Sequence, residues 1–134
     1  MTMEIDEVRL EAFMGSMVGH LTGAVTVSCA LLGHQVGYYE AMAYQGPMAA
    51  DDVARAAGAN PRVTREWLDQ QASVGIVAHD AAGDTYELGP EAALALAAEH
   101  SPVVLAGGLH AFRAMAIDID KLTTAYKDDG ALGW

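Results

Sequence analysis

The sequence is poor in positive charge and contains almost no cysteine. Seven Lys and Arg residues stand against 18 Asp and Glu, which gives a formal net charge of −11 at pH 7. Proteins bind nucleic acids and anionic lipids largely because Lys and Arg displace counterions, so this balance argues against DNA, RNA and membranes as partners. The single cysteine, Cys29, excludes an internal disulfide framework and fits a reducing cytoplasm.

Targeting and membrane-spanning signals are also missing. Residues 1–7 are acidic and lack the basic start and apolar core of a signal peptide. The most apolar run, residues 21–33, is short and contains Thr, Ser and Gly, so we do not expect it to span a bilayer. We expect a cytoplasmic protein.

No motif for a nucleotide, a metal or a nucleophile is complete. Gly107-Gly108 falls in an expected helix with no strand before it, so no phosphate-binding turn or methyl-donor pocket is predicted. No two histidines have the i, i+4 spacing, and a metal site would require His20, His34 and His110 to converge in space. We therefore predict no catalytic residue, no metal ligand and no cofactor in this chain.

Helical periodicity dominates what the sequence does contain, and hydrophobic residues make up 52 % of it. Apolar residues spaced i, i+3, i+4 and i+7 predict a helix over residues 5–21. Residues 22–33 continue it as a helix that is apolar on nearly every side, which predicts burial between other elements. A short helix then ends near residue 42. This apolar excess predicts a partner, and we expect a homodimer.

Residues 47–88 have the pattern of a winged helix-turn-helix. A first helix over residues 49–57 is ended by Gly58. The Asn60 side chain is suited to cap a second helix, over residues 61–74, which starts with a proline. These two helices and the turn between them form the helix-turn-helix, which comes before the β-hairpin of the wing.

Two short runs, residues 76–79 and 85–88, predict a β-hairpin wing because turn-forming residues separate them. In a DNA-binding protein the second helix and the wing would carry Lys and Arg. Here the outward side chains of the second helix have no net charge: Arg62, Arg65, Glu66 and Asp69. The charge pattern indicates a winged helix used for another purpose.

Two further helices are predicted after the wing. Gly89-Pro90 starts an alanine-rich helix that ends near His100. Ser101-Pro102 opens a long helix that reaches Lys127. The ending, residues 128–134, is interpreted as a linker into a further domain.

The predicted fold is a single, mainly α-helical domain over residues 1–134. It is a winged helix-turn-helix with a two-stranded β-hairpin wing, flanked by long N- and C-terminal helices. Residues 1–46 form the N-terminal dimerisation helices, residues 47–88 the winged helix, and residues 89–134 the C-terminal helices and the linker to a missing domain.

Seven residues are candidates for a small-molecule pocket. His20 and His110 lie on apolar helices near opposite ends of the chain, and Arg113 follows His110 by three residues. If the first and last helices pack together, these groups would be polar anchors within apolar walls, as in small-molecule sites. The alternative interpretation makes the histidines surface or helix-cap residues and the two tyrosines core or interface residues. The candidates are Met14, Met17, His20, Tyr38, Tyr39, His110 and Arg113.

The order of these elements resembles the N-terminal winged-helix domain of bacterial class I S-adenosylmethionine-dependent methyltransferases, over about residues 8–134. Its most specific pieces are Gly37-Tyr38-Tyr39 and Arg65-Glu66-Trp67-Leu68 with the following hairpin. The resemblance implies a non-catalytic domain that makes a homodimer contact and covers the substrate pocket. A following Rossmann-like domain would bind S-adenosylmethionine; that domain is absent here, so we expect no methyl transfer by this chain alone.

Three functions are therefore compatible with the sequence. The first is the dimerisation and substrate-recognition domain of a methyltransferase. The second is a stand-alone accessory protein that binds a hydrophobic small molecule, in which substitution of His20, His110 or Arg113 should weaken binding. The third is a winged-helix transcription regulator, which requires salt-sensitive DNA binding through Arg62 and Arg65.

Overall fold

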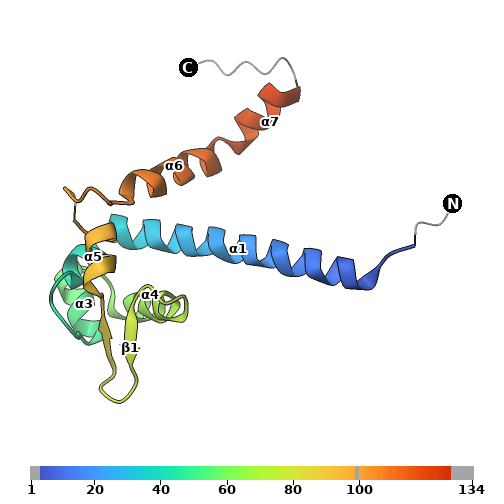
Figure 1. Cartoon of the computed structure of the whole chain (residues 1–134). Helices are drawn as coiled ribbons and strands as arrows, with labels where there is room; N and C mark the ends of the chain where they lie inside the picture. The colour runs from blue at the N-terminus through green and yellow to red at the C-terminus, as the bar shows by residue number, and fades with distance from the viewer. Residues whose placement is uncertain (1–3, 99, 128–134) are drawn as a thin grey trace.

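The structure, a computed structural model, describes residues 4–98 and 100–127. These residues form helices and one two-stranded antiparallel sheet, which confirms the predicted mainly α winged helix-turn-helix fold. Figure 1 shows the winged helix gathered around one end of α1, while the rest of α1 extends away from it. In chain order the elements are α1 (Glu7–Val36), α2 (Tyr38–Met42), α3 (Ala50–Ala57), α4 (Pro61–Ser73), β1 (Ala78–Asp80), β2 (Thr85–Glu87), α5 (Pro90–Leu96), α6 (Ala106–Ile117) and α7 (Ile119–Lys127).

Helix α1 is one continuous helix of 30 residues. Its start is capped by Asp6, whose carboxylate accepts a hydrogen bond from the Arg9 backbone N–H at 3.1 Å. It ends at Gly37, whose φ of 87° is favourable for glycine. The prediction that residues 22–33 are buried on every side is wrong: Val25 and Leu32 are exposed, because the winged helix covers only one face of this segment.

The two helices of the helix-turn-helix have the predicted ends at the turn between them, while the start of α3 and the end of α4 each differ by one residue from the prediction. Gly58 closes α3 in the left-handed conformation, at φ 65°. The Asn60 side chain accepts hydrogen bonds from the backbone N–H groups of Arg62 and Val63 and so caps α4, whose first residue is Pro61.

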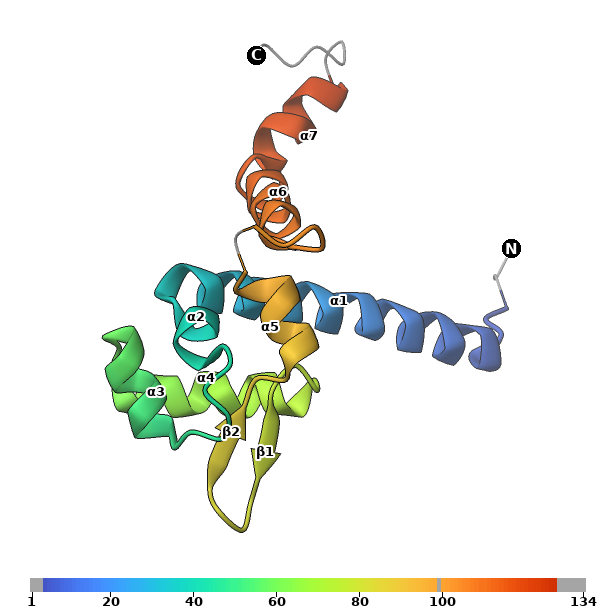
Figure 2. The same cartoon turned by 60° about the vertical axis from the view of Figure 1, so that its left-hand side comes forward.

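The wing is a short hairpin (Figure 2) in which Ala78, His79 and Asp80 pair with Glu87, Tyr86 and Thr85. The Asp80 carboxylate accepts hydrogen bonds from the backbone N–H groups of Ala82 and Gly83, which organises the turn. Met48 and Tyr86 exchange two backbone hydrogen bonds of 2.8 Å, so the segment before α3 extends the pairing beyond the hairpin.

Trp67 joins the winged helix to α1. Its Nε1 donates a hydrogen bond of 2.9 Å to the Cys29 carbonyl, and its ring lies against Tyr38, with 4.5 Å between ring centroids. The ring occupies the space above Gly33, where a Cβ would stand 2.1 Å from Trp67 Cζ2. A glycine is therefore required in α1 at the point where α4 crosses it.

The C-terminal part differs from the sequence prediction in two respects. The alanine-rich helix α5 ends at Leu96, and the single long helix predicted from Ser101 to Lys127 is instead two helices. The second of these begins after a break at Asp118, and the first begins only at Ala106. The predicted linker, residues 128–134, lies outside the described residues.

Candidate functional site

The arginines of the winged helix are engaged within the chain. The Arg62 guanidinium lies 2.6 Å from a Glu66 carboxylate oxygen, one turn along α4. Arg65 forms a two-pronged pair with the carboxylate of Asp84, in the turn of the wing just before β2, with N–O distances of 2.6 and 3.1 Å. Arg55 makes a single contact with the Asp52 carboxylate on α3. A phosphate backbone would have to displace these carboxylates.

The pair between Arg65 and Asp84 belongs to a cluster that ties the wing to α4. The His79 ring stacks on Tyr86 at 4.5 Å between centroids, and its Nε2 lies 3.6 Å from Asp84. The Tyr86 hydroxyl donates a hydrogen bond to the Asp69 carboxylate on α4. The hydrogen bond from Arg65 lowers the pKa of Asp84, because it stabilises the charged carboxylate.

We expect the domain to lose stability above pH 10, as Tyr86 is forced to ionise. Burial and the Asp69 carboxylate raise the pKa of Tyr86 from 10.0 to about 12 in the folded chain. A raised folded pKa gives stability that is complete below pH 10 and is lost as pH rises toward 12. Burial also raises the pKa of Tyr39, in the same direction. Urea unfolding at a series of alkaline pH values measures the effect, and Tyr86→Phe should make the decline less steep.

Two of the predicted pocket residues, Tyr38 and Tyr39, are core residues. The Tyr38 hydroxyl is 2.8 Å from Thr64 Oγ1, and Thr64 in turn donates to the Asn60 carbonyl, so Tyr38 is the donor. The Tyr39 hydroxyl donates to Gln71 Oε1 at 2.6 Å. Both rings are buried, as the alternative interpretation of the sequence expected.

The structure does not bring His20 and His110 together. The His110 ring instead lies edge-on to His34, with 5.7 Å between ring centroids. His20 stands 14 positions before His34 on α1, about 21 Å along the helix axis. It lies beside Ser16, and Arg113 is exposed on α6. No group of three potential metal ligands occurs in residues 4–98 and 100–127.

The sequence did not predict His34 as a pocket residue. Fourteen residues are close to four helical turns, so His34 and His20 share nearly the same face of α1, and only the crossing of α6 selects between them. The crossing lies near the C-terminal end of α1, where Leu109 of α6 is buried. This arrangement places His34 beside His110.

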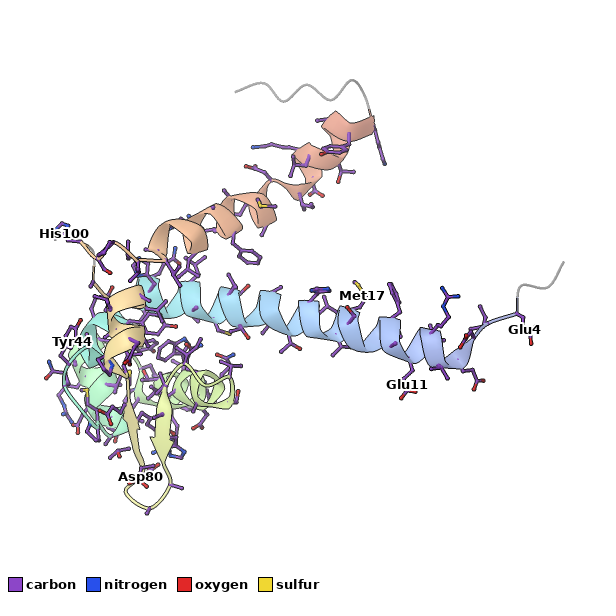
Figure 3. All side chains as sticks on the ribbon, in the orientation of Figure 1. Glu4, Glu11, Met17, Tyr44, Asp80 and His100 are labelled. Carbon is purple, nitrogen blue, oxygen red and sulfur yellow. The ribbon has the colours of Figure 1, made fainter. Side chains whose placement is uncertain are left out.

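An exposed apolar stripe follows α1 and contains the other two predicted residues, Met14 and Met17. Figure 3 shows Met17 on the part of α1 that extends away from the winged helix. Seven apolar side chains follow the helical repeat on this side of α1, and each is at least 41 % exposed. By length and composition alone α1 is also sufficient to cross a membrane, a test that core helices of soluble proteins and signal sequences pass as well. The stripe consists of Leu10, Phe13, Met14, Met17, Val18, Leu21 and Val25.

Helix α7 and the start of α6 carry further apolar surface. A hollow of about 650 Å³ follows α7 and is lined by Met115, Ile119, Leu122 and Tyr126, among others. A groove of about 390 Å³ lies between α1, α5 and α6, with Val27, Ala95 and Leu109 among its walls. Apolar surface of this extent is unusual on a monomeric soluble domain.

Comparison with known families identifies the winged helix. Residues 22–98, more than half of the chain, match the family described as the Rv2258c-like winged helix-turn-helix domain. The chain belongs to that family. The match covers α2–α5, the wing and the C-terminal half of α1, and so includes the Trp67 junction that holds the Rv2258c-like domain together.

Solved structures with the same fold include methyltransferases. The mitomycin 7-O-methyltransferase MmcR is 23 % identical, with a TM-score of 0.71 over 92 % of this chain and 36 % of its own. Human N-acetylserotonin methyltransferase in complex with SAM is 17 % identical, with a TM-score of 0.68 over 96 % of this chain and 36 % of its own. PigF with SAH is 15 % identical, with a TM-score of 0.70 over 86 % of this chain and 33 % of its own.

This chain thus spans about a third of the length of these solved structures. At these identities the likeness is one of fold. No curated protein sequence matches the chain.

Proposed function

We propose that this chain is the dimerisation and substrate-recognition domain of a cytoplasmic S-adenosylmethionine-dependent methyltransferase, and that it is not catalytic by itself. The methyl donor would bind, and methyl transfer would take place, in a part of the enzyme outside the third that this chain matches. The match of fold to methyltransferases over 86–96 % of the chain supports this assignment.

The observation that carries the dimer is the exposed stripe of α1. The only buried residues of this 30-residue helix are Ala30, Leu31 and Gly33, near its C-terminal end. The remainder presents large apolar side chains to solvent, which costs about 25 cal/mol per Å² relative to burial. A second copy of the chain offers the same stripe, and a two-fold axis brings identical surfaces together.

Light scattering over a concentration series tests the proposal. We expect a mass of twice the 14.0 kDa of one chain. Calorimetric titration with S-adenosylmethionine should give no heat of binding. A monomer at every concentration would contradict the dimer, and saturable binding of the methyl donor would contradict the non-catalytic role.

A transcription regulator requires salt-sensitive binding to duplex DNA. We expect no such binding by this chain at low ionic strength. The basic side chains of α4 are already paired with carboxylates, and the chain carries a formal net charge of −11. An electrophoretic mobility shift experiment measures this. DNA binding that weakens with salt and is lost in Arg65→Ala would instead support a transcription regulator as the function.

A further inference from the structure

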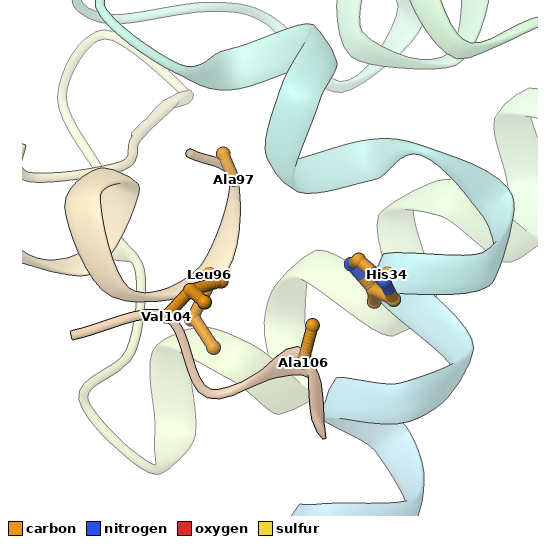
Figure 4. Close-up of a pocket in the computed structure, with 5 residues that line it drawn as sticks. All are labelled: His34, Leu96, Ala97, Val104 and Ala106. Atoms are coloured by element: carbon orange, nitrogen blue, oxygen red, sulfur yellow. The ribbon is translucent and has the colours of Figure 1, made fainter. Parts of the chain in front are cut away.

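A third, smaller pocket lies where α6 begins, beside His34 (Figure 4). Its volume is about 140 Å³. Its only polar lining side chain among the described residues is the His34 imidazole, which faces four apolar side chains across the pocket. These are Leu96, Ala97, Val104 and Ala106.

The wall opposite His34 is held in place by the backbone. The Leu105 N–H donates a hydrogen bond of 2.8 Å to the Ala95 carbonyl, which ties the segment before α6 to α5. The Val103 N–H is held by the Ser101 side chain at 3.2 Å. The pocket is thus part of the folded chain rather than a gap between loose segments.

Two neighbours orient the His34 ring. Nδ1 is buried, and the Oε1 atom of Glu40 on α2 lies 3.5 Å from it. His110 of α6 contacts the ring edge-on. A carboxylate beside Nδ1 favours the tautomer with its proton on Nδ1, because the other tautomer would place two acceptors face to face.

In this tautomer Nε2 accepts a hydrogen bond, and it is the ring nitrogen that a ligand can reach, since Nδ1 is buried. A ligand must then supply a donor, such as a hydroxyl. The four apolar side chains around it disfavour a charged ligand, which would lose its hydration without gaining a partner. The volume is close to that of a cavity of about 150 Å³ that accommodates benzene.

We propose that the pocket beside His34 binds a small neutral aromatic alcohol of the size of phenol, whose hydroxyl donates a hydrogen bond to Nε2 of His34. The site goes beyond the proposed function, because it lies away from the α1 stripe and does not require a dimer. Loss of the dimer would therefore leave this binding intact.

The test is an NMR titration of the isotopically labelled full chain with phenol, observed at the His34 imidazole of the wild type and, in every variant, at the backbone amides of Ala97 and Val104, which line the pocket. We expect saturable shifts with a dissociation constant on the order of 1 mM, as for a ligand of seven heavy atoms. Ala106→Leu fills the pocket and should weaken phenol binding at least about tenfold, by steric exclusion. Ala56→Leu makes the same change on the exposed surface of α3 and should bind as the wild type does.

Toluene, which has the shape of phenol without the donor, separates the hydrogen bond from the pocket. His34→Phe should lower the affinity for phenol about tenfold, since the buried hydroxyl loses its acceptor, while the affinity for toluene stays unchanged. The proposal is overturned if phenol causes no saturable shift at His34, or if Ala106→Leu binds phenol as the wild type does. An equal loss of affinity for phenol and for toluene in His34→Phe would also overturn the assigned hydrogen bond. If His34→Phe does not fold, the phenol titrations of the wild type and of Ala106→Leu still test the proposal.

Discussion

Gly33→Ala is expected to destabilise the domain by about 2–3 kcal/mol, although alanine is the better helix former. The added Cβ would stand 2.1 Å from Cζ2 and 2.8 Å from Cε2 of Trp67. The Trp67 ring cannot simply turn away, because its Nε1 is hydrogen-bonded to Cys29 and its face is packed on Tyr38. Either α1 and α4 must separate or the core must repack. Urea unfolding at one fixed protein concentration measures the loss.

Gly19→Ala is the matched control, because it makes the same change in the same helix. No atom lies within 4 Å of the Cβ position at Gly19, so this variant should be more stable than the wild type by about 0.5–1 kcal/mol. The two substitutions should therefore shift stability in opposite directions. Trp67→Phe should recover part of the loss when combined with Gly33→Ala, since the smaller ring relieves the contact. Equal changes in the free energy of unfolding of Gly33→Ala and Gly19→Ala would show that α4 is not tightly packed on α1 at Gly33.

Phe13→Asp is expected to convert the proposed dimer into a monomer. Phe13 lies within the apolar stripe and is 61 % exposed in the single chain. In a two-fold dimer both copies bury an unpaired carboxylate, at about 2 kcal/mol or more each, which weakens association on the order of a thousandfold. Sedimentation velocity over a concentration series should show the 14.0 kDa species alone.

Tyr44→Asp is the matched control for that substitution. Tyr44 is also a large exposed apolar residue, at 68 %, but it follows α2, just before the winged helix, rather than lying on the stripe. Its φ of 61° is one that aspartate tolerates. This variant should remain dimeric. If Phe13→Asp remained dimeric, the interface would not lie on the stripe; if Tyr44→Asp were monomeric, the interface would include the segment after α2.

Most of the local structure could be predicted because its signals lie within a few residues of one another. Asn60 caps the helix that begins at Pro61, and Gly58 ends the helix before it, as the sequence predicted. The first strand begins two residues and ends one residue later than predicted, and the second ends one residue earlier, because strand ends depend on pairing across the hairpin. The break at Asp118 was missed, since apolar residues continue the helical repeat through it.

The candidate pocket was less predictable, because it depends on where helices cross. Helical spacing correctly places His20 and His34 on nearly one face of α1, but does not reveal which of them α6 reaches. The two tyrosines were predicted as pocket residues, but their hydroxyls are hydrogen-bonded to Thr64 and Gln71 inside the core.

By itself the sequence determined the winged helix, the shortage of positive charge on its second helix, and the apolar character of the terminal helices. Each is a property of composition or of spacing along the chain. Only the tertiary structure decided that Trp67 closes on Gly33, that His34 rather than His20 meets His110, and that the stripe on α1 stays open. Those contacts join residues 34 to 76 positions apart, and the angles at which helices cross are set by the packing of whole faces, which no local pattern contains.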